Sequence, residues 1–182
     1  MHRLSRCPLT LAQGAGNLVV FAAEHVAEEE CGAFLGRQPL EQNKERHGQV
    51  RCQLAAVLTL FELVKLRASY LNGCAFCVDM HTKDARAAGE TEQRLYAVPV
   101  WRETPFFTPR ERAALAWTEM VTDLGREGVT DEAYDAARAH FDEAELVWLT
   151  MAIVAINGWN RLSVAFRADV GGYQPKRREA VR

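Results

Sequence analysis

The sequence has no long apolar run. None of its apolar stretches approaches the roughly 18 residues that a membrane-spanning helix needs, and the longest, Leu146–Ile156, is interrupted by Thr150. We expect this stretch to form a buried core helix and the protein to have no membrane partner. The N-terminal stretch 9–23 is only patchily apolar, which makes it a poor core for a secretory signal peptide.

The sequence also has no large excess of positive or negative charge, and its number of cysteines is odd. Its 22 basic and 24 acidic side chains give a formal net charge of −2, whereas a nucleic-acid-binding protein usually presents a strongly basic face. Its five cysteines favour free or catalytic thiols in a reducing compartment over a secreted disulfide framework. These features argue against nucleic acid as a partner and predict a cytoplasmic protein.

What is present is an ordinary globular composition. Of 182 residues, 48% are hydrophobic and 25% are charged, which suits one domain that buries a core without disulfides. No segment alternates apolar and polar residues with the period of a strand, so the predicted fold class is all-α. We divide the chain into an atypical N-terminal extension with weak or no fixed structure (1–49), a helical domain (50–170) and a basic C-terminal tail (171–182).

Helical spacing and terminal residues predict six helices, with order beginning near Val50. Their expected ranges are 54–71, 74–88, 92–98, 109–124, 131–141 and 143–168. Asn72 is expected to cap the second helix and Gly89 to end it. Segment 101–107 is expected to be a loop, and Thr108-Pro109-Arg110-Glu111 has the pattern of a capping box. The last helix has a possible kink at Asn157–Gly158.

The segment Asn72-Gly73-Cys74-Ala75-Phe76-Cys77-Val78-Asp79-Met80-His81 carries the chemistry. On a helix that advances about 100° per residue, Cys74, Cys77 and His81 fall on one face. The cysteines lie one turn apart, so their sulfurs can meet, and His81 reaches Cys77 more easily than Cys74. A helix start, a nearby imidazole and a partner thiol all favour a thiolate. Peroxide would oxidise this thiolate to a sulfenic acid, and a second cysteine within reach would convert the sulfenic acid to a disulfide.

Two other interpretations of this segment stay open. The Cys-x2-Cys-x3-His spacing offers three zinc ligands, but a structural zinc site needs four, and His140 has no neighbouring cysteine. We therefore expect no metal. Alternatively, Cys74 and Cys77 are buried as small hydrophobic residues beside a core histidine.

Glu62 is the next candidate for a functional role. It lies in the first predicted helix, with Leu58 and Leu66 one turn to either side. A partly buried carboxylate there would have a raised pKa and could relay a proton to a nearby histidine. Alternatively, Glu62 is a surface residue that pairs with Lys65 at i+3. Periodicity alone does not decide between the two.

Over roughly residues 56–168 the sequence resembles the alkylhydroperoxidase D-like (AhpD-like) branch of the carboxymuconolactone decarboxylase superfamily. The combined Glu-x11-Cys-x2-Cys-x3-His spacing is more specific than a lone Cys-x-x-Cys pair. The resemblance continues through the flanking segments Glu62–Arg67, Leu95–Ala97, Trp101–Pro105, Glu111–Trp117 and Ile156–Arg161.

The resemblance implies an all-helical fold, a homo-oligomer that is a trimer or hexamer, and thiol-dependent reduction of hydroperoxides without a cofactor. By matching positions, Cys77 would be the peroxidatic cysteine, Cys74 the resolving cysteine, and His81 and Glu62 the proton relay. The partners would be a hydroperoxide and a dithiol electron donor. Cys77 should then ionise with an apparent pKa below the free-thiol value of about 8.5, and replacing Glu62 or His81 should raise that pKa.

The sequence departs from the family pattern in two places. The best-known AhpD proteins have a second histidine directly before the later cysteine, and here that residue is Phe76, so the relay would be simpler. Residues 1–55 do not resemble the usual family N-terminus, and they contain three cysteines without a family role: Cys7, Cys31 and Cys52.

Several aromatic side chains could line an apolar pocket suited to an organic peroxide: Tyr70, Phe76, Trp101 and Trp159. Two other functions stay open at this point. A decarboxylase or related lyase would keep its activity after loss of both thiols. A non-catalytic redox-sensing oligomer would form its disulfide over hours without turnover.

Overall fold

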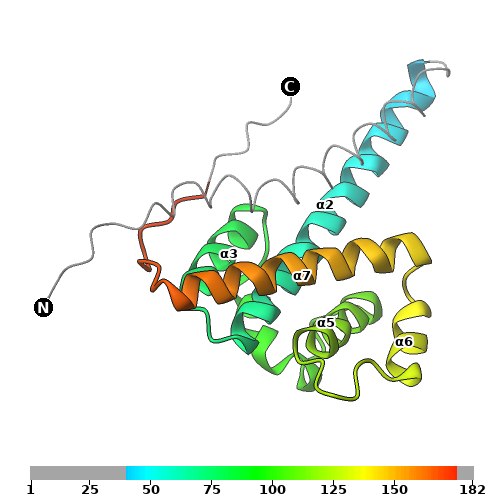
Figure 1. Ribbon diagram of the computed structural model, residues 1–182. Helices are drawn as coiled ribbons and strands as arrows, with labels where there is room; N and C mark the ends of the chain where they lie inside the picture. The colour runs from blue at the N-terminus through cyan, green and yellow to red at the C-terminus, as the bar shows by residue number, and fades with distance from the viewer. Residues whose placement is uncertain (1–39, 176–182) are drawn as a thin grey trace, which may run out of the picture. The chain divides into compact units, whose positions relative to one another are not determined.

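The structure, a computed structural model, describes the backbone of residues 40–175 and the side chains of residues 56–175. Within these ranges every regular element is a helix (Figure 1), which confirms the all-α prediction for this part of the chain. The chain divides into two compact units between Leu58 and Thr59. Most of the expected N-terminal extension lies outside the described residues, as do Cys7, Cys31 and the side chain of Cys52.

The helices in chain order are α2 (Leu40–Leu71), α3 (Ala75–Ala87), α4 (Glu92–Ala97), the 3-10 helix η2 (Val98–Glu103), α5 (Pro109–Thr122), α6 (Asp131–Arg138) and α7 (Glu143–Ala165). Helix α2 thus begins well before Val50, the expected start of order. Helix η2 occupies the first part of the expected loop 101–107. Helices α5, α6 and α7 each end a few residues earlier than predicted.

The expected terminal signals are confirmed at most helix ends. Thr108 and Glu111 form the predicted capping box of α5. Gly89 ends α3 in a left-handed conformation (φ +99°), a conformation that a residue with a side chain rarely adopts. Asn72 does not cap α3, because Cys74 is the N-cap residue. Helix α7 continues without a break through Asn157 and Gly158.

The second unit packs around the C-terminal part of α2. Leu63 and Leu66 of α2 face a cluster built with α3, α4, η2 and α5, whereas Leu60 and Val64 face a cluster built with α5, α6 and α7. Helix α7 runs from beside α6 at its N-terminal end to beside α3 at its C-terminal end (Figure 1). This arrangement lets residues of α2, α3 and α7 meet.

The prediction that Leu146–Ile156 forms a buried core helix holds for one side of helix α7 only. Its inner face packs Leu149, Ile153 and Ile156 into the fold. Along the opposite face runs an apolar stripe of half-exposed side chains, which we call the outer stripe: Val147, Met151, Val154 and Leu162. None of the described helices is both long enough and apolar enough to cross a membrane.

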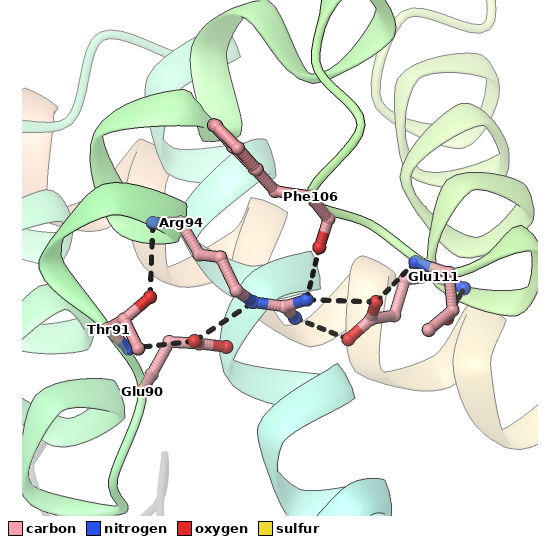
Figure 2. A network of polar contacts seen from close by, with 6 residues as sticks. Glu90, Thr91, Arg94, Phe106 and Glu111 are labelled. Atoms are coloured by element: carbon pink, nitrogen blue, oxygen red, sulfur yellow. Dashed lines mark hydrogen bonds and ion pairs between the residues drawn. The ribbon is translucent and has the colours of Figure 1, made fainter.

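Arg94 connects α4 to the segment before α5 (Figure 2). Its guanidinium donates to Glu90 Oε1 at 2.9 Å, to the carbonyl of Phe106 at 2.5 Å and to Glu111 Oε1 at 2.5 Å. It also lies over the ring of Phe107, 5.0 Å from the centroid. Glu111 is the capping-box residue of α5, so this one side chain holds the start of α5 against α4.

We expect Arg94→Ala to lower the free energy of unfolding by about 2–4 kcal/mol, because it leaves two largely buried carboxylates without their cation. The matched control is Arg86→Ala. Arg86 pairs with Glu92, but both side chains are about half exposed, so the loss should stay below about 1 kcal/mol. Urea unfolding followed by circular dichroism measures both, and equal losses would contradict the assigned role of Arg94.

Candidate functional site

The turn before α3 places both sulfurs inside the fold. Gly73 adopts a left-handed conformation (φ +63°), and the backbone N–H of Cys74 donates to the carbonyl of Ser69 at 3.0 Å. Cys74 is the N-cap residue of α3, and Cys77 lies in its first turn. Each cysteine is only 1% exposed, and both pack against Ile156 of α7.

Polar side chains of α7 surround the sulfur of Cys77. Its Sγ lies 3.8 Å from Ser163 Oγ, and the side chain of Asn160 makes a second hydrogen bond to it. Asn160 is itself fully buried, and it accepts from Asn72 Nδ2 at 2.9 Å and donates to Ser69 Oγ at 3.1 Å. The amide of Asn160 therefore joins α7, the end of α2 and the cysteine pair.

Burial raises the pKa of Cys77 to about 12, and the neighbouring Cys74 adds to this increase. The hydrogen bonds from Asn160 and Ser163 lower the pKa but do not outweigh burial. The prediction that Cys77 ionises below about 8.5 is therefore wrong for the reduced protein. Cys77 keeps its proton at neutral pH, so a base must take that proton as the sulfur reacts.

Glu62, Lys65 and His81 form a second buried cluster. Glu62 Oε2 lies 3.0 Å from His81 Nδ1, and Glu62 Oε1 accepts from Lys65 Nζ at 2.5 Å. The side chains of Glu62, Lys65 and His81 are only 13%, 11% and 7% exposed. Glu62 therefore makes both of the contacts that the sequence left as alternatives, one with each oxygen, and it is not a surface residue.

The charges of this cluster set its protonation. Burial favours the neutral acid form of Glu62, but the Lys65 ammonium and His81 together outweigh burial and lower the pKa of Glu62 to about 2. The raised pKa expected for a buried carboxylate is therefore wrong. Burial, followed by the charge of Lys65, lowers the pKa of His81 in spite of Glu62. At neutral pH the cluster holds an ionised Glu62 and an uncharged His81.

The structure brings the four predicted site residues together as two pairs, Cys74 with Cys77 and Glu62 with His81. Nε2 of His81 is buried and makes no hydrogen bond to any atom among the described residues. The predicted proton relay therefore has no direct hydrogen bond from His81 to Cys77. The catalytic roles of all four residues remain predictions.

The start of the expected C-terminal tail lies against α3, beside the Glu62–His81 pair. Lys83 Nζ donates to the carbonyls of Gly171 and Tyr173 at 3.2 and 3.1 Å, and the Tyr173 hydroxyl donates to Asp84 Oδ1 at 2.8 Å. Burial raises the pKa of Asp84 and that of Tyr173. Asp84 was not among the predicted site residues, and its spacing of one turn from His81 was its only signal in the sequence.

Glu62, His81 and Asp84 offer ligand atoms that all lie within 4.8 Å of one another. A cation there would have to displace Lys65, whose ammonium lies 2.5 Å from Glu62, and Asp84 already accepts from Tyr173. This cluster therefore suits proton transfer better than metal binding. In the part of the chain that the structure describes, no such group includes Cys74 or Cys77.

The four aromatic residues expected to line one pocket lie in two places. Phe76 and Trp159 pack against the cluster that contains the sulfurs. Tyr70 and Trp101 pack in a different cluster, between α2 and η2, so the four side chains do not gather around one pocket as expected. A cavity of about 470 Å³ lies elsewhere, between α5 and α6.

The pKa values of Glu62 and His81 predict that acid destabilises the protein. Both are lower in the folded protein than the ordinary values of 4.5 and 6.5, so the unfolded chain binds more protons as the pH falls. The stability that they contribute is complete above pH 6.5. It declines below that value, first through His81 and then, below pH 4.5, through Glu62.

Urea unfolding at several pH values tests this expectation. The midpoint should decrease steadily from about pH 7 to about pH 4, and Glu62→Gln should flatten the lower part of that decline. A wild-type midpoint that stays constant over this range would contradict the assigned protonation states.

Comparison with known proteins now adds to this geometry. A family model described as the carboxymuconolactone decarboxylase family matches residues 57–120. The uncharacterized protein YdfG of Bacillus subtilis is 50% identical over 107 residues, which cover 59% of this chain and 73% of YdfG. The chain belongs to the carboxymuconolactone decarboxylase family. A second relative, the uncharacterized protein YnjA of Escherichia coli, is 32% identical over 58% of this chain and 56% of its own length.

Two crystal structures place this family member in the AhpD-like branch and confirm the resemblance seen in the sequence. A protein of unknown function from Agrobacterium tumefaciens, provisionally assigned as the antioxidant defence protein AhpD, is 37% identical with a TM-score of 0.65, and the match covers 92% of this chain and 99% of that one. The alkylhydroperoxidase AhpD core of an uncharacterized peroxidase-related protein from Ralstonia eutropha is 26% identical with a TM-score of 0.51, and covers 59% and 56% of the two chains.

Proposed function

We propose that this AhpD-like protein is a thiol-dependent peroxidase that reduces organic hydroperoxides, with Cys77 as peroxidatic and Cys74 as resolving cysteine. The observation that carries the proposal is the pair of neighbouring sulfurs at the start of α3, with Cys77 one helical turn before His81 and its Glu62 partner. The names of the relatives from Agrobacterium and Ralstonia, which refer to antioxidant defence and peroxidases, support the same reaction class.

In the first step the sulfur of Cys77 attacks the terminal oxygen of the hydroperoxide. The S–O bond forms as the O–O bond breaks, and Cys77 becomes a sulfenic acid. His81 accepts the thiol proton and passes it to the departing alkoxide, which leaves as an alcohol. A base is needed because burial holds the pKa of Cys77 near 12, so little thiolate is present beforehand.

In the second step the sulfur of Cys74 attacks the sulfenic sulfur of Cys77 and releases water, which leaves a disulfide. An external dithiol donor then reduces this disulfide by thiol–disulfide exchange and becomes oxidised itself. Both sulfurs are 1% exposed, so the side chains over them must move before peroxide or donor can reach them. We therefore expect slower oxidation than for an exposed thiolate.

The test is stopped-flow oxidation of the full chain with cumene hydroperoxide. The wild-type protein should consume peroxide and lose both free thiols to a disulfide, Cys77→Ser should consume none, and Cys74→Ser should stop at a sulfenic acid that dimedone traps. A wild-type protein that reacts no faster than Cys77→Ser would overturn the proposal. Decarboxylase or related lyase activity that persists after loss of both thiols would instead support the decarboxylase alternative.

We also propose that the protein is a homo-oligomer, a trimer or hexamer, that associates through the outer stripe of α7. Val147, Met151 and Val154 are 58%, 49% and 53% exposed and lie on one helical face. A continuous row of exposed apolar side chains is characteristic of an interaction surface. Because a closed homo-oligomer requires a matching surface on each copy, a second copy of this chain is the simplest occupant.

Light scattering after size-exclusion chromatography tests the oligomer. Met151→Glu and Val154→Glu place a charge in the outer stripe and should convert the oligomer to smaller species, because an unpaired charge in an apolar interface is costly. Arg126→Gln changes the charge by the same amount at an exposed loop position and should have no effect. A wild-type protein that is monomeric would contradict the proposal.

A further inference from the structure

Lys65 is an unusual neighbour for a proton-relay carboxylate. Its side chain is 11% exposed, and its ammonium donates to Glu62 Oε1 at 2.5 Å. Lysine is almost never buried without an oppositely charged partner. Here Glu62 is that partner, so the charge of Lys65 balances that of Glu62 before His81 takes up any proton.

The opposite oxygen of Glu62 fixes the tautomer of His81. Because Glu62 is ionised, its Oε2 can only accept, so Nδ1 of His81 must carry the hydrogen across the 3.0 Å contact. In the uncharged imidazole the other nitrogen, Nε2, then keeps its lone pair. Nε2 is the atom that makes no hydrogen bond to the described residues, so it is available to accept a proton.

A buried carboxylate and imidazole without Lys65 would behave differently. The carboxylate would attract a proton onto His81, because an ion pair balances the buried negative charge. His81 would then be an imidazolium with hydrogen on both nitrogens, and it could no longer act as a base. The ammonium of Lys65 removes that attraction by balancing Glu62 itself.

We propose that Lys65 is a positioning residue that keeps His81 uncharged, with Nε2 free to accept the proton of Cys77. The inference rests on the proposed peroxidase function for its purpose, but its content is the protonation state of His81. Lys65 acts through Glu62 and does not touch the reacting atoms. The charged or titratable groups that surround His81 are Lys65 and Glu62 of α2, Asp84 of α3 and, through Asp84, Tyr173.

The wild-type protein provides the first test. Nitrogen-15 NMR of the reduced protein should show His81 as the uncharged Nδ1–H tautomer at pH 7. An imidazolium at pH 7, or the Nε2–H tautomer, would overturn the inference without any variant. This measurement does not depend on turnover.

Two variants provide the second test. Lys65→Met keeps an unbranched side chain but removes the charge, and it should raise the pKa of His81 by at least about one unit. The rate of Cys77 oxidation should then fall about tenfold for each pH unit below the raised His81 pKa and recover above it, once His81 loses its proton. Lys65→Arg keeps the charge and should retain the wild-type His81 pKa and rate profile.

The outcomes separate this inference from the proposed function. If Lys65→Met folds and leaves the His81 pKa unchanged, the inference is wrong even if the protein is a peroxidase. If the His81 pKa rises as expected but the wild-type protein consumes no hydroperoxide, the role of Lys65 stands and the peroxidase proposal fails. Should Lys65→Met not fold, the wild-type tautomer still decides the question.

Discussion

Replacing His81 by alanine is expected to slow the oxidation of Cys77 by an organic hydroperoxide about 10²–10⁴-fold at pH 7, the usual contribution of a general base. The reason is the raised pKa of the Cys77 thiol, about 12, which leaves very little thiolate at that pH. Without the imidazole, hydroxide must remove the proton. The loss in rate should therefore become smaller as the pH rises toward the pKa of the Cys77 thiol.

Stopped-flow rates between about pH 6 and pH 10 measure this effect. His140→Ala is the matched control, because His140 is exposed at the end of α6 and lies outside the site, and it should react like the wild type. A His81→Ala protein with the wild-type rate at pH 7 would show that the proton of Cys77 leaves by another route.

The second large effect is expected from Asn160→Ala, which should lower the free energy of unfolding by about 2–4 kcal/mol. Asn160 is fully buried and bonds to the buried Ser69 and the half-buried Asn72, so its removal costs each of them a hydrogen bond, at about 1–3 kcal/mol for a buried group. The variant also loses a hydrogen bond that lowers the pKa of Cys77. Its thiol should therefore react more slowly with peroxide at neutral pH.

Urea unfolding and stopped-flow oxidation measure these two consequences separately. Ser163→Ala is the control for stability, since the hydrogen bond described for the Ser163 side chain is with the Cys77 sulfur, at 3.8 Å, and a weak bond to sulfur should cost below about 1 kcal/mol. If Asn160→Ala were as stable as Ser163→Ala, the amide would not have the connecting role assigned to it.

The helices and the grouping of the site residues were largely predictable from the sequence. The capping box at Thr108 and the glycine stop at Gly89 are local signals, and local signals suffice for helix ends. The spacing of Cys74 and Cys77 placed both sulfurs on one face, and the structure keeps them together. The prediction that Asn72 caps α3 was wrong. Its side-chain amide instead donates to Asn160 of α7, a tertiary contact between residues 88 positions apart in the sequence.

The protonation states could not be predicted in the same way. A helix N-terminus and a nearby imidazole are visible in the sequence and favour a thiolate, whereas the depth of burial that raises the pKa of Cys77 depends on packing between α3 and α7. Glu62 shows the opposite error. Its burial was one of two open alternatives, and Lys65 was treated as an alternative partner to His81, whereas the two oxygens of the one carboxylate contact both.

Helix α7 and the segment after it contribute residues to the candidate site, so the protein cannot be shortened far without losing part of that site. A fragment trimmed to 57–120, the stretch that the family model matches, would retain Cys74, Cys77 and His81. It would lack Asn160 and Ser163, which hold the sulfur, and Tyr173, which bonds to Asp84. The Cys-x2-Cys-x3-His motif is thus not a self-sufficient unit, and grafting it onto another scaffold would transfer the reactive atoms without the surroundings that govern them.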